Sequence, residues 1–343
     1  MIRIYKTGAH INRSPLSYRA LAALFEGSVR FVNTPAQADL FLFAHTMDLE
    51  DIPMNVCAAW RQNPRPIVVL SEEPFWDTIW GKRPLQRDYI IDTRFGAVPV
   101  VQLNHHTSKI FAFDRIPYYL LTNHRFASAY AYHFRRNAAR CAADWKAGFE
   151  RRAVDVTFMA ERRPESYHNV RFAEGDIIGL CAWRTELALG CRARNVERLG
   201  QSWQGGATRL TLQDWHLDKL VRLNRRARIL SGVENTHQPD YITEKIFDAF
   251  ALGARPLYFA SPGHRMHGFN LPPDAWLNLY DLPVNAAVDA IDAAPFDAAF
   301  YEAYTEAQQR LEALFTSPAL FVAERERLQK SVLEELTEVL NGA

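Results

Sequence analysis

Apolar runs of strand length alternate with segments of helical periodicity along the first part of the chain. The strand-length runs are Ile2–Tyr5, Val29–Val32, Leu40–Phe43 and Ile67–Leu70, and the segments with helical spacing are Ser14–Phe25 and Leu49–Gln62. Strands that alternate with helices build parallel sheets, because each crossover helix covers a face of the sheet. The pattern therefore predicts an open parallel sheet with helices on both faces.

The same alternation returns in the second part of the chain. Strands are predicted at Val154–Phe158, Val196–Leu199, Arg226–Val233 and Leu257–Phe259, and helices at Trp183–Leu189, at Leu212–Leu223 and from Glu244 onward. The sequence shows no internal repeat and no low-complexity segment. We therefore expect an α/β protein with two Rossmann-like, doubly wound domains that face each other across a cleft.

Domain boundaries follow from this division. A basic helical stretch between Tyr130 and Arg152 precedes the first strand of the second half, so we expect an N-terminal domain of residues 1–145 and a second domain of residues 150–315. Residues 316–343 contain a final helix, predicted over Pro318–Leu340. This helix packs either back on the first domain or on its own domain, and the sequence favours neither.

Composition narrows the classes of function. Of the 343 residues 48% are hydrophobic, which is enough to fill two cores. The formal net charge of +1 lacks the strong basic excess of a duplex-binding protein, so no nucleic-acid partner is expected. The cysteines have no close metal-ligand spacing, and their small number indicates a reducing compartment; they are Cys57, Cys141, Cys181 and Cys191.

The first residues, MIRIYKTGAHINR, contain no continuous apolar core of the kind that a secretory leader or a membrane anchor needs. We therefore expect a cytoplasmic protein that associates at most peripherally with the inner face of the cytoplasmic membrane.

The most informative chemistry lies within residues 230–262, where a predicted strand passes into a helix. Residues 235–240 are rich in turn formers, and Thr243 is expected to cap the helix that begins near Glu244. The unpaired N–H groups and the positive dipole end of this helix lie beside Glu244 and Lys245, an arrangement that favours a bound anion. The pattern is also typical of a capped, solvated first turn, and periodicity alone does not separate these interpretations.

The segment ENTHQPDYITEK, followed by a helix and by RPLYFASPGHRMHGFNLPPDAWLNLYDL, resembles the signature region of the α-1,3/1,4-fucosyltransferases, the family 10 glycosyltransferases. Members of that family have approximately F-E-N-x-x-x-x-D-Y-[IV]-T-E-K, then a helix, a short strand and a Pro-rich segment. The residues that match in place and order are Glu234, Asn235, Asp240, Tyr241, Thr243, Glu244 and Lys245, whereas Val233 replaces the family phenylalanine. The resemblance extends over roughly residues 150–285.

The resemblance implies a soluble bacterial enzyme of the GT-B glycosyltransferase architecture. Such an enzyme transfers L-fucose from GDP-β-L-fucose, with inversion, to a hydroxyl of an oligosaccharide or lipopolysaccharide that contains N-acetylglucosamine or galactose. The product carries an α-1,3 or α-1,4 linkage. No metal or other cofactor is expected, because cationic side chains take the metal's place and Asp88 and Asp92 are interpreted as loop residues rather than as a metal-binding motif.

A departing diphosphate needs cationic side chains to stabilise its charge. The resemblance implies Lys245 and Arg184 for this role, and Gly200 follows Arg184 at the position where family members end a short strand. Arg171 is the rival of Arg184, because the segment around it is longer than the family loop. An arginine has a planar fork that suits a phosphate, although any single arginine is also typical of a surface ion pair.

The remaining donor residues come from the same signature. The resemblance implies that Glu244 accepts hydrogen bonds from donor hydroxyls, those of the ribose above all, since two vicinal hydroxyls suit one carboxylate. It also implies that Asn235 and Tyr241 line the donor pocket. Glu234 either joins them or fixes the turn.

A proton acceptor is expected from the first domain. The run VVLSEEPFWD, residues 68–77, ends an apolar strand with two carboxylates at the edge where open α/β sheets bind ligands. Family members carry Glu-Ser-Pro at a comparable point, and alignment on Pro74 implies Glu72 as the general base, with Glu73 as its rival. Alternatively, Ser71 caps a helix whose first turn holds both glutamates.

Acceptor recognition is poorly encoded. An aromatic and imidazole-rich stretch is suited to stacking on sugar rings, although we expect about half of it to be core; it comprises Phe75, Trp76, Trp80, His105, His106, Tyr118, Tyr119 and His124. Two other functions remain open: a glycosyltransferase of the same architecture that uses another nucleotide sugar, and a carbohydrate-binding protein without catalysis.

Overall fold

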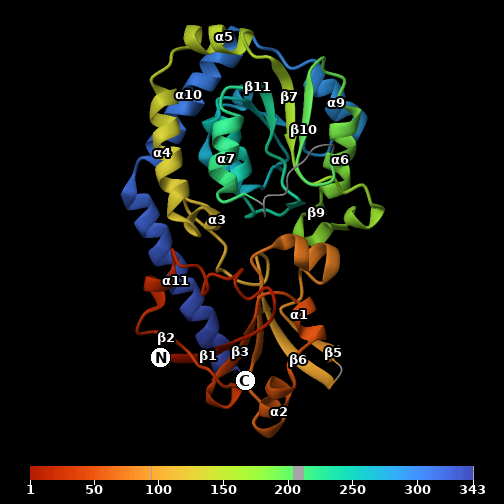
Figure 1. The fold of residues 1–343 in the computed structure, drawn as a ribbon, viewed down its shortest axis with the longest axis vertical. Helices are drawn as coiled ribbons and strands as arrows, with labels where there is room; N and C mark the ends of the chain where they lie inside the picture. Colours follow the sequence, from red (N-terminus) through yellow and green to blue (C-terminus); the bar gives the residue numbers. More distant parts are fainter. Residues whose placement is uncertain (94, 204–211, 343) are drawn as a thin grey trace. The chain divides into compact units, whose positions relative to one another are not determined.

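The computed structural model describes residues 1–93, 95–203 and 212–342 and divides into two units (Figure 1). The first unit consists of Met1–His124 and Ala319–Ala343, and the second of Arg125–Pro318. This division lies earlier in the chain than the predicted boundary between Tyr130 and Arg152. The reason is that helices α4 (His124–Ala138) and α5 (Ala142–Glu150) pack within the second unit, where the Tyr130 hydroxyl donates to Asp248 at 2.7 Å.

The first unit is built on a sheet of six strands in the order β2-β1-β3-β4-β6-β5. All neighbours are parallel except β5, which is antiparallel to β6. The strands are β1 (Ile2–Lys6), β2 (Val29–Phe31), β3 (Leu40–Phe43), β4 (Ile67–Leu70), β5 (Asp88–Thr93) and β6 (Gly96–Leu103). Asp88 and Asp92 therefore lie in a strand, and their interpretation as loop residues is wrong. The β5–β6 pair was not predicted, because Ile90 on the exposed face of β5 breaks the apolar/polar alternation and Pro99 interrupts the apolar run of β6.

Two predicted helices of the first unit differ from the structure. Ser14–Phe25 is a series of turns that ends in a short 3₁₀ turn, Ala22–Phe25, so the helix prediction there is wrong. Tyr18 of this segment and Arg13 just before it make long-range contacts with Glu72 instead. The second predicted helix is split at Pro53, which has no N–H to donate, into α1 (Met47–Glu50) and α2 (Met54–Gln62).

Both faces of the first sheet are covered. Phe41 and Phe43 of β3 pack with Leu49 and Val56 of the first two helices, whereas Leu42, on the opposite face of the strand, is also fully buried. Helix α11 (Pro318–Asn341) runs through this unit. Its Glu335 accepts hydrogen bonds from the Lys109 N–H at 2.8 Å and from Arg87 at 2.8 Å. The short helix α3 (Tyr118–Leu121) also belongs to this unit, which ends at His124 before the chain enters the second unit.

The second unit contains a fully parallel sheet in the order β10-β7-β11-β13-β14. Its strands are β7 (Val154–Met159), β10 (Val196–Leu199), β11 (Ala227–Ser231), β13 (Arg255–Tyr258) and β14 (Leu277–Asn278). Its remaining helices are α6 (Cys181–Gly190), α7 (Trp215–Arg222), α8 (Glu244–Ala251), α9 (Val284–Asp292) and α10 (Ala298–Phe315).

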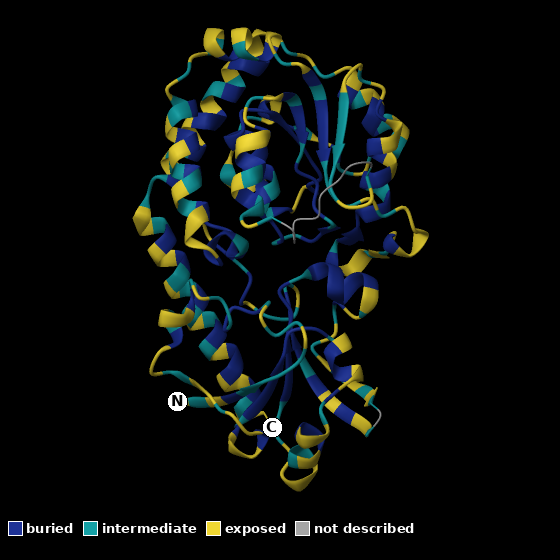
Figure 2. Cartoon of the chain, in the orientation of Figure 1, coloured by how far each residue is buried: buried dark blue, intermediate teal, exposed yellow. Residues whose placement is uncertain are grey.

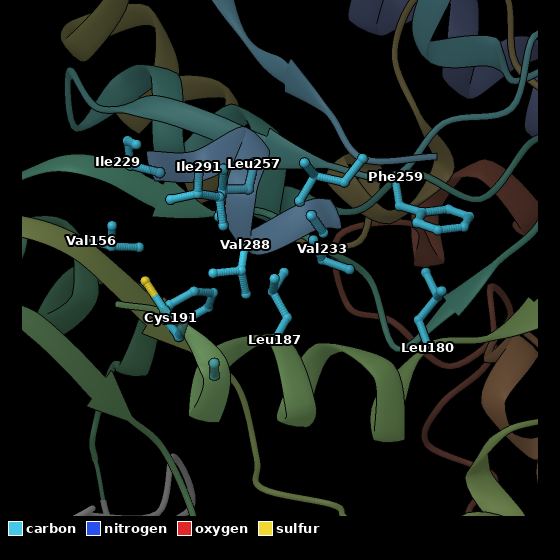
Figure 3. Packing of buried hydrophobic residues seen from close by; sticks show 14 of the residues in the cluster. Val156, Leu180, Leu187, Cys191, Ile229, Val233, Leu257, Phe259, Val288 and Ile291 are labelled. Carbon is cyan, nitrogen blue, oxygen red and sulfur yellow. The ribbon is translucent and has the colours of Figure 1, made fainter. Parts of the chain in front are cut away.

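Helices lie on both faces of the second sheet. Leu187 of α6, Val288 of α9 and Ile229 of β11 belong to one apolar cluster (Figure 3). Leu230, the next residue along β11, packs against α7 and α8 on the other face, because successive strand residues point in opposite directions. Strands β7, β11 and β13 are largely buried, whereas the helices around them carry many exposed positions (Figure 2). Together with the first sheet, this arrangement confirms the predicted α/β class with two doubly wound parallel sheets.

A small antiparallel sheet accompanies the second unit. Its strands, in the order β12-β9-β8, are β12 (Thr236–His237), β9 (Ile177–Gly179) and β8 (Arg171–Phe172). Strand β12 belongs to the turn that follows β11, so this turn is anchored by backbone pairing and is not a free loop.

In the described part of the chain, no helix combines the length and the apolar character that a crossing of the lipid bilayer requires.

Candidate anion-binding site and proton-accepting carboxylate

The strand order of the second sheet marks where a ligand is expected. Along the chain the order is 2-1-3-4-5, so the direction of winding reverses between β7 and β11. Open α/β sheets bind ligands beyond the carboxyl ends of the strands at this reversal. Strand β11 ends at Ser231, and the signature residues begin three positions later at Glu234. The predicted donor residues thus follow a strand at the switch point.

Gly232 allows the end of β11 to approach the first turn of α8. A Cβ atom at this position would lie 3.0 Å from the Ile246 Cα and 3.1 Å from the Ile246 nitrogen. These are backbone atoms, which do not move aside as a flexible side chain does. Glycine therefore permits close packing of the strand end against the helix start, and a larger residue would push the two backbones slightly apart.

Glu234, Thr243 and Lys245 form one hydrogen-bonded network at the start of α8. The Lys245 ammonium lies 2.7 Å from Glu234 Oε2 and 2.8 Å from the Thr243 hydroxyl oxygen. The N–H and the hydroxyl of Thr243 both donate to Glu234 Oε1, at 2.9 and 2.7 Å. Thr243 occupies the N-cap position, but its side chain does not cap the helix as predicted, because the buried carboxylate takes its hydrogen bonds.

Of the two charged side chains in this network, Glu234 is buried and Lys245 is partly exposed. Burial is the main cause that raises the pKa of Glu234, and the Glu244 carboxylate adds to it, whereas the Lys245 ammonium opposes the shift. The Lys245 side chain is 22% exposed, while that of Glu234 is 3% exposed. A ligand can therefore reach the ammonium but not the carboxylate that holds it.

Arg184 is brought to the same turn. Its Nη1 donates to the Val233 carbonyl at 3.3 Å, and its Nε is buried with no hydrogen-bond partner in the described residues. Helix α6 begins at Cys181, so Arg184 lies one turn inside the helix and not at its start. The rival Arg171 is exposed on β8, where it lies 3.8 Å from the carboxylate of Asp281.

The other predicted donor residues are also near this turn. The Asn235 carbonyl accepts from the Leu180 N–H at 2.9 Å, which joins the turn to the beginning of α6. Tyr241 and Glu244 are both buried, and the Tyr130 hydroxyl donates to the Glu244 carbonyl at 3.2 Å. The structure brings the predicted residues of the signature together within one unit.

Sequence reasoning missed Tyr258, at the end of β13. Burial, with Glu234 and Glu244 nearby, raises its pKa well above the usual value. Its hydroxyl is buried without a hydrogen-bond partner in the described part of the chain. A tyrosine inside an apolar strand gives no sequence signal for such a position.

In the first unit, the predicted base Glu72 is held by three donors. Its Oε1 accepts from Arg13 Nε at 2.5 Å and from the Tyr18 hydroxyl at 2.5 Å, and its Oε2 accepts from the Tyr118 hydroxyl at 2.7 Å. The side chain is 1% exposed. Both oxygens of this carboxylate are therefore engaged, and its partners come from segments 59, 54 and 46 residues away.

Glu73 differs from its neighbour. Its side chain is 15% exposed, and its Oε2 lies 3.3 Å from Arg13 Nη2. The helical turn that follows begins at Pro74, so Ser71 lies three residues before it and neither glutamate belongs to its first turn. The alternative interpretation of this segment as a capped helix start is wrong.

The aromatic stretch is partly core, as expected. Phe75, Trp76 and Tyr118 are buried, whereas Trp80 is 43% exposed. His105 stacks on a phenylalanine and hydrogen-bonds to the Glu72 carbonyl at 2.9 Å, and burial lowers its pKa to about 4. Two of these rings, His105 and Tyr118, therefore hold Glu72 in place.

Comparison with known proteins gives distant likenesses. No protein-family model and no curated protein matches the chain. Among solved structures, it is similar to an α1,3-fucosyltransferase with GDP-fucose, at 15% identity and a TM-score of 0.42 over 90% of this chain and 81% of that one. A second α1,3-fucosyltransferase structure has 13% identity and a TM-score of 0.41, over 93% and 91%. A complex of Anabaena Alr3699/HepE with UDP has 10% identity and a TM-score of 0.42, over 98% and 100%.

Proposed function

We propose that the protein is a glycosyltransferase that transfers a sugar from a nucleoside diphosphate to a carbohydrate hydroxyl. The observation that carries this proposal is the Lys245 ammonium at the first turn of α8, beside the strand where the second sheet reverses its winding. Helix N–H groups, a lysine and a nearby arginine suit the two phosphates of such a donor.

The second unit stabilises the leaving group. When the bond between the sugar and the diphosphate breaks, negative charge grows on the bridging phosphate oxygen, and a preorganised cation lowers the energy of that state. Lys245 and Arg184 supply this charge in the proposal. The buried partner Glu234 holds the ammonium in position, which reduces the reorganisation that the reaction requires.

The first unit activates the acceptor hydroxyl. The resemblance of the run SEEP to the family motif implies Glu72 as the base and Glu73 as its rival. Displacement by a hydroxyl on the face opposite the diphosphate inverts the configuration at the anomeric carbon. Glu244, Asn235 and Tyr241 are proposed to contact the donor nucleoside and sugar, as the resemblance implies.

The donor that best fits the signature ENTHQPDYITEK is GDP-β-L-fucose, and the acceptor is a glycan that contains N-acetylglucosamine or galactose. The proposed product is an α-1,3 or α-1,4 linkage. Charge stabilisation by side chains also leads us to propose that no metal is needed.

Two measurements test this function. Calorimetric titration with GDP, UDP, CMP and ADP is expected to show the tightest binding for GDP, and a preference for UDP would redirect the proposal to another nucleotide sugar. Transfer from GDP-fucose to an array of galactose- and N-acetylglucosamine-containing oligosaccharides is expected to proceed equally well in excess chelator. Glycan binding without any donor hydrolysis or transfer would refute the enzyme and leave a carbohydrate-binding protein.

A further inference from the structure

A histidine and an aspartate form a close pair at the carboxyl edge of the first sheet. His10 follows β1, and Asp48 lies in α1, shortly after β3. The His10 Nδ1 lies 2.8 Å from Asp48 Oδ1, and the His10 backbone N–H donates to Asp48 Oδ2 at 3.2 Å. Strands β1 and β3 are the pair between which the winding of this sheet reverses, so the pair lies where an open α/β sheet binds ligands.

The backbone makes room for this carboxylate. A Cβ atom at Gly8 would lie 2.4 Å from Asp48 Oδ2 and 2.8 Å from the Asp48 Cβ, so only glycine is compatible with the observed position. Gly8 also has a φ of +105°, which other residues rarely adopt. The Asp48 side chain is 4% exposed, whereas that of His10 is 39% exposed. The aspartate is thus fixed and buried, and the imidazole is accessible.

The contact with Asp48 decides which ring nitrogen accepts a proton. An ionised carboxylate only accepts hydrogen bonds, so the His10 Nδ1 carries the hydrogen and Nε2 keeps its lone pair. Asp48 thus fixes the orientation and the tautomer of the ring, as a base-orienting aspartate does.

The other groups around His10 do not compete for this role. The His45 ring lies 4.8 Å away, and burial lowers its pKa to about 4, so it stays neutral. The Trp76 ring lies 5.2 Å from His10 and also contacts the Arg13 guanidinium, at 5.5 Å. His10 and Arg13, the partner of Glu72, therefore have the Trp76 ring as a common neighbour.

The two candidates differ in availability. A hydroxyl can reach Glu72 only by displacing a tyrosine or the arginine, because three donors engage its two oxygens and the side chain is 1% exposed. The Nε2 of His10 needs no such displacement.

We infer that His10, oriented by Asp48, is the proton acceptor of the proposed transfer, and that Glu72 is a positioning residue. This inference rests on the proposed function. The acceptor oxygen forms a bond to the anomeric carbon as the bond to the diphosphate breaks, and the breaking bond's electron pair leaves on the diphosphate. The hydroxyl proton passes to Nε2 of His10, and the imidazolium later loses it to water.

The test compares variants of the full chain in the transfer assay. Without its base, the variant H10Q is expected to lose about 10²- to 10⁴-fold in turnover, while its affinity for GDP stays that of the wild type. In H10A, added imidazole is expected to restore part of the activity, which a merely structural role would not allow. D48N is expected to lower turnover and leave the Michaelis constant unchanged, because it acts through His10.

The pH profile separates histidine from carboxylate. A histidine base loses activity as the pH falls through about 5 to 8, the range in which imidazole is protonated, whereas a free carboxylate does so near about pH 4. The wild type and E72Q are expected to lose activity in the pH range of imidazole protonation, and H10Q is expected to show no such decrease.

Wild-type turnover in H10Q, or an acid limb of the pH profile that E72Q removes and H10Q retains, would overturn the inference in favour of Glu72. Failure of the wild type to bind any nucleotide would appear before a variant is compared, and would refute the proposed function and this inference with it.

Discussion

The two units hold a buried carboxylate after a parallel strand in different ways. Glu234, in the second unit, is held by Thr243 and Lys245, which follow within the same signature. Glu72, in the first unit, is held by Arg13, Tyr18 and a tyrosine from beyond β6. The Glu234 site is formed by residues close together in the sequence, and its Lys245 ammonium is partly exposed. The Glu72 site is assembled from distant segments, and its carboxylate is buried. The chemistry proposed for each unit follows from this difference.

A second pair of buried carboxyl groups extends the comparison. Asp248 of α8 lies 2.8 Å from both His216 Nε2 and Lys219 Nζ, and these cations hold its pKa well below the usual range against the effect of burial. Asp77 of the first unit has no ion pair among the described residues, and burial raises its pKa to about 8. Asp248 is therefore ionised and Asp77 protonated at neutral pH.

The largest expected effect is on the charged cluster of the second unit. D248N leaves the buried Lys219 without a counter-charge, which is expected to lower the free energy of unfolding by about 3–5 kcal/mol. Urea unfolding of the wild type and D248N measures this difference. The folded-state pKa of Asp248 is depressed, so its contribution is present above the unfolded value and decreases as the pH falls through the folded value. A loss below about 1 kcal/mol would show that the pair contributes no more than an exposed one.

The enclosed carboxylate of the first unit gives the next effect. E72Q replaces a charged acceptor of three hydrogen bonds by a neutral one. A hydrogen bond to a charged group contributes about 1.5–3 kcal/mol, which corresponds to a change in rate of roughly 10- to 150-fold. We expect this loss in turnover, with GDP affinity unchanged because that site belongs to the other unit. Steady-state kinetics measures the turnover, and calorimetry measures the GDP affinity. A loss of GDP binding in E72Q would contradict the assignment of separate roles.

The close approach at Gly232 gives an intermediate effect. G232A is expected to cost about 1–3 kcal/mol in unfolding free energy, because the added methyl meets the Ile246 backbone at 3.0 Å. Gly263, in the same unit, has no atom within 4 Å of its ideal Cβ and no positive φ, so G263A serves as the matched control. Equal stability of the two variants would show that the strand end does not press on the helix start.

The smallest effect at acid pH is expected for Asp77. Its folded-state pKa is raised, so the folded protein binds one more proton than the unfolded chain between about pH 4 and 8, and stability falls as the pH rises through this window. D77N resembles the protonated acid and is expected to be close to neutral at pH 5 and to stabilise the protein at pH 8. Urea unfolding at both values tests this, and a slope that D77N leaves intact would contradict the raised pKa.

The difference between local contacts and contacts of distant segments explains which features could be predicted from the sequence. Periodicity identified most of the parallel strands, though not β6 or β14, and the signature located Glu234 and Lys245, because those features are local. The contact of Arg13 and Tyr18 with Glu72 depends on segments more than 50 residues apart, and this tertiary demand also overrode the predicted helix over Ser14–Phe25. His10 carried no signal, since a lone histidine after a strand acquires its role only when a distant aspartate meets it.

The central claim is that Lys245 binds a diphosphate at the first turn of α8. It is tested most directly by calorimetric titration of GDP into the wild type, K245Q and K146Q, where Lys146 is an exposed lysine of the same unit, paired with Glu150. Loss of a charged contact is expected to weaken GDP binding about 10- to 100-fold in K245Q and to leave K146Q like the wild type. Equal affinity in all three proteins would contradict the account.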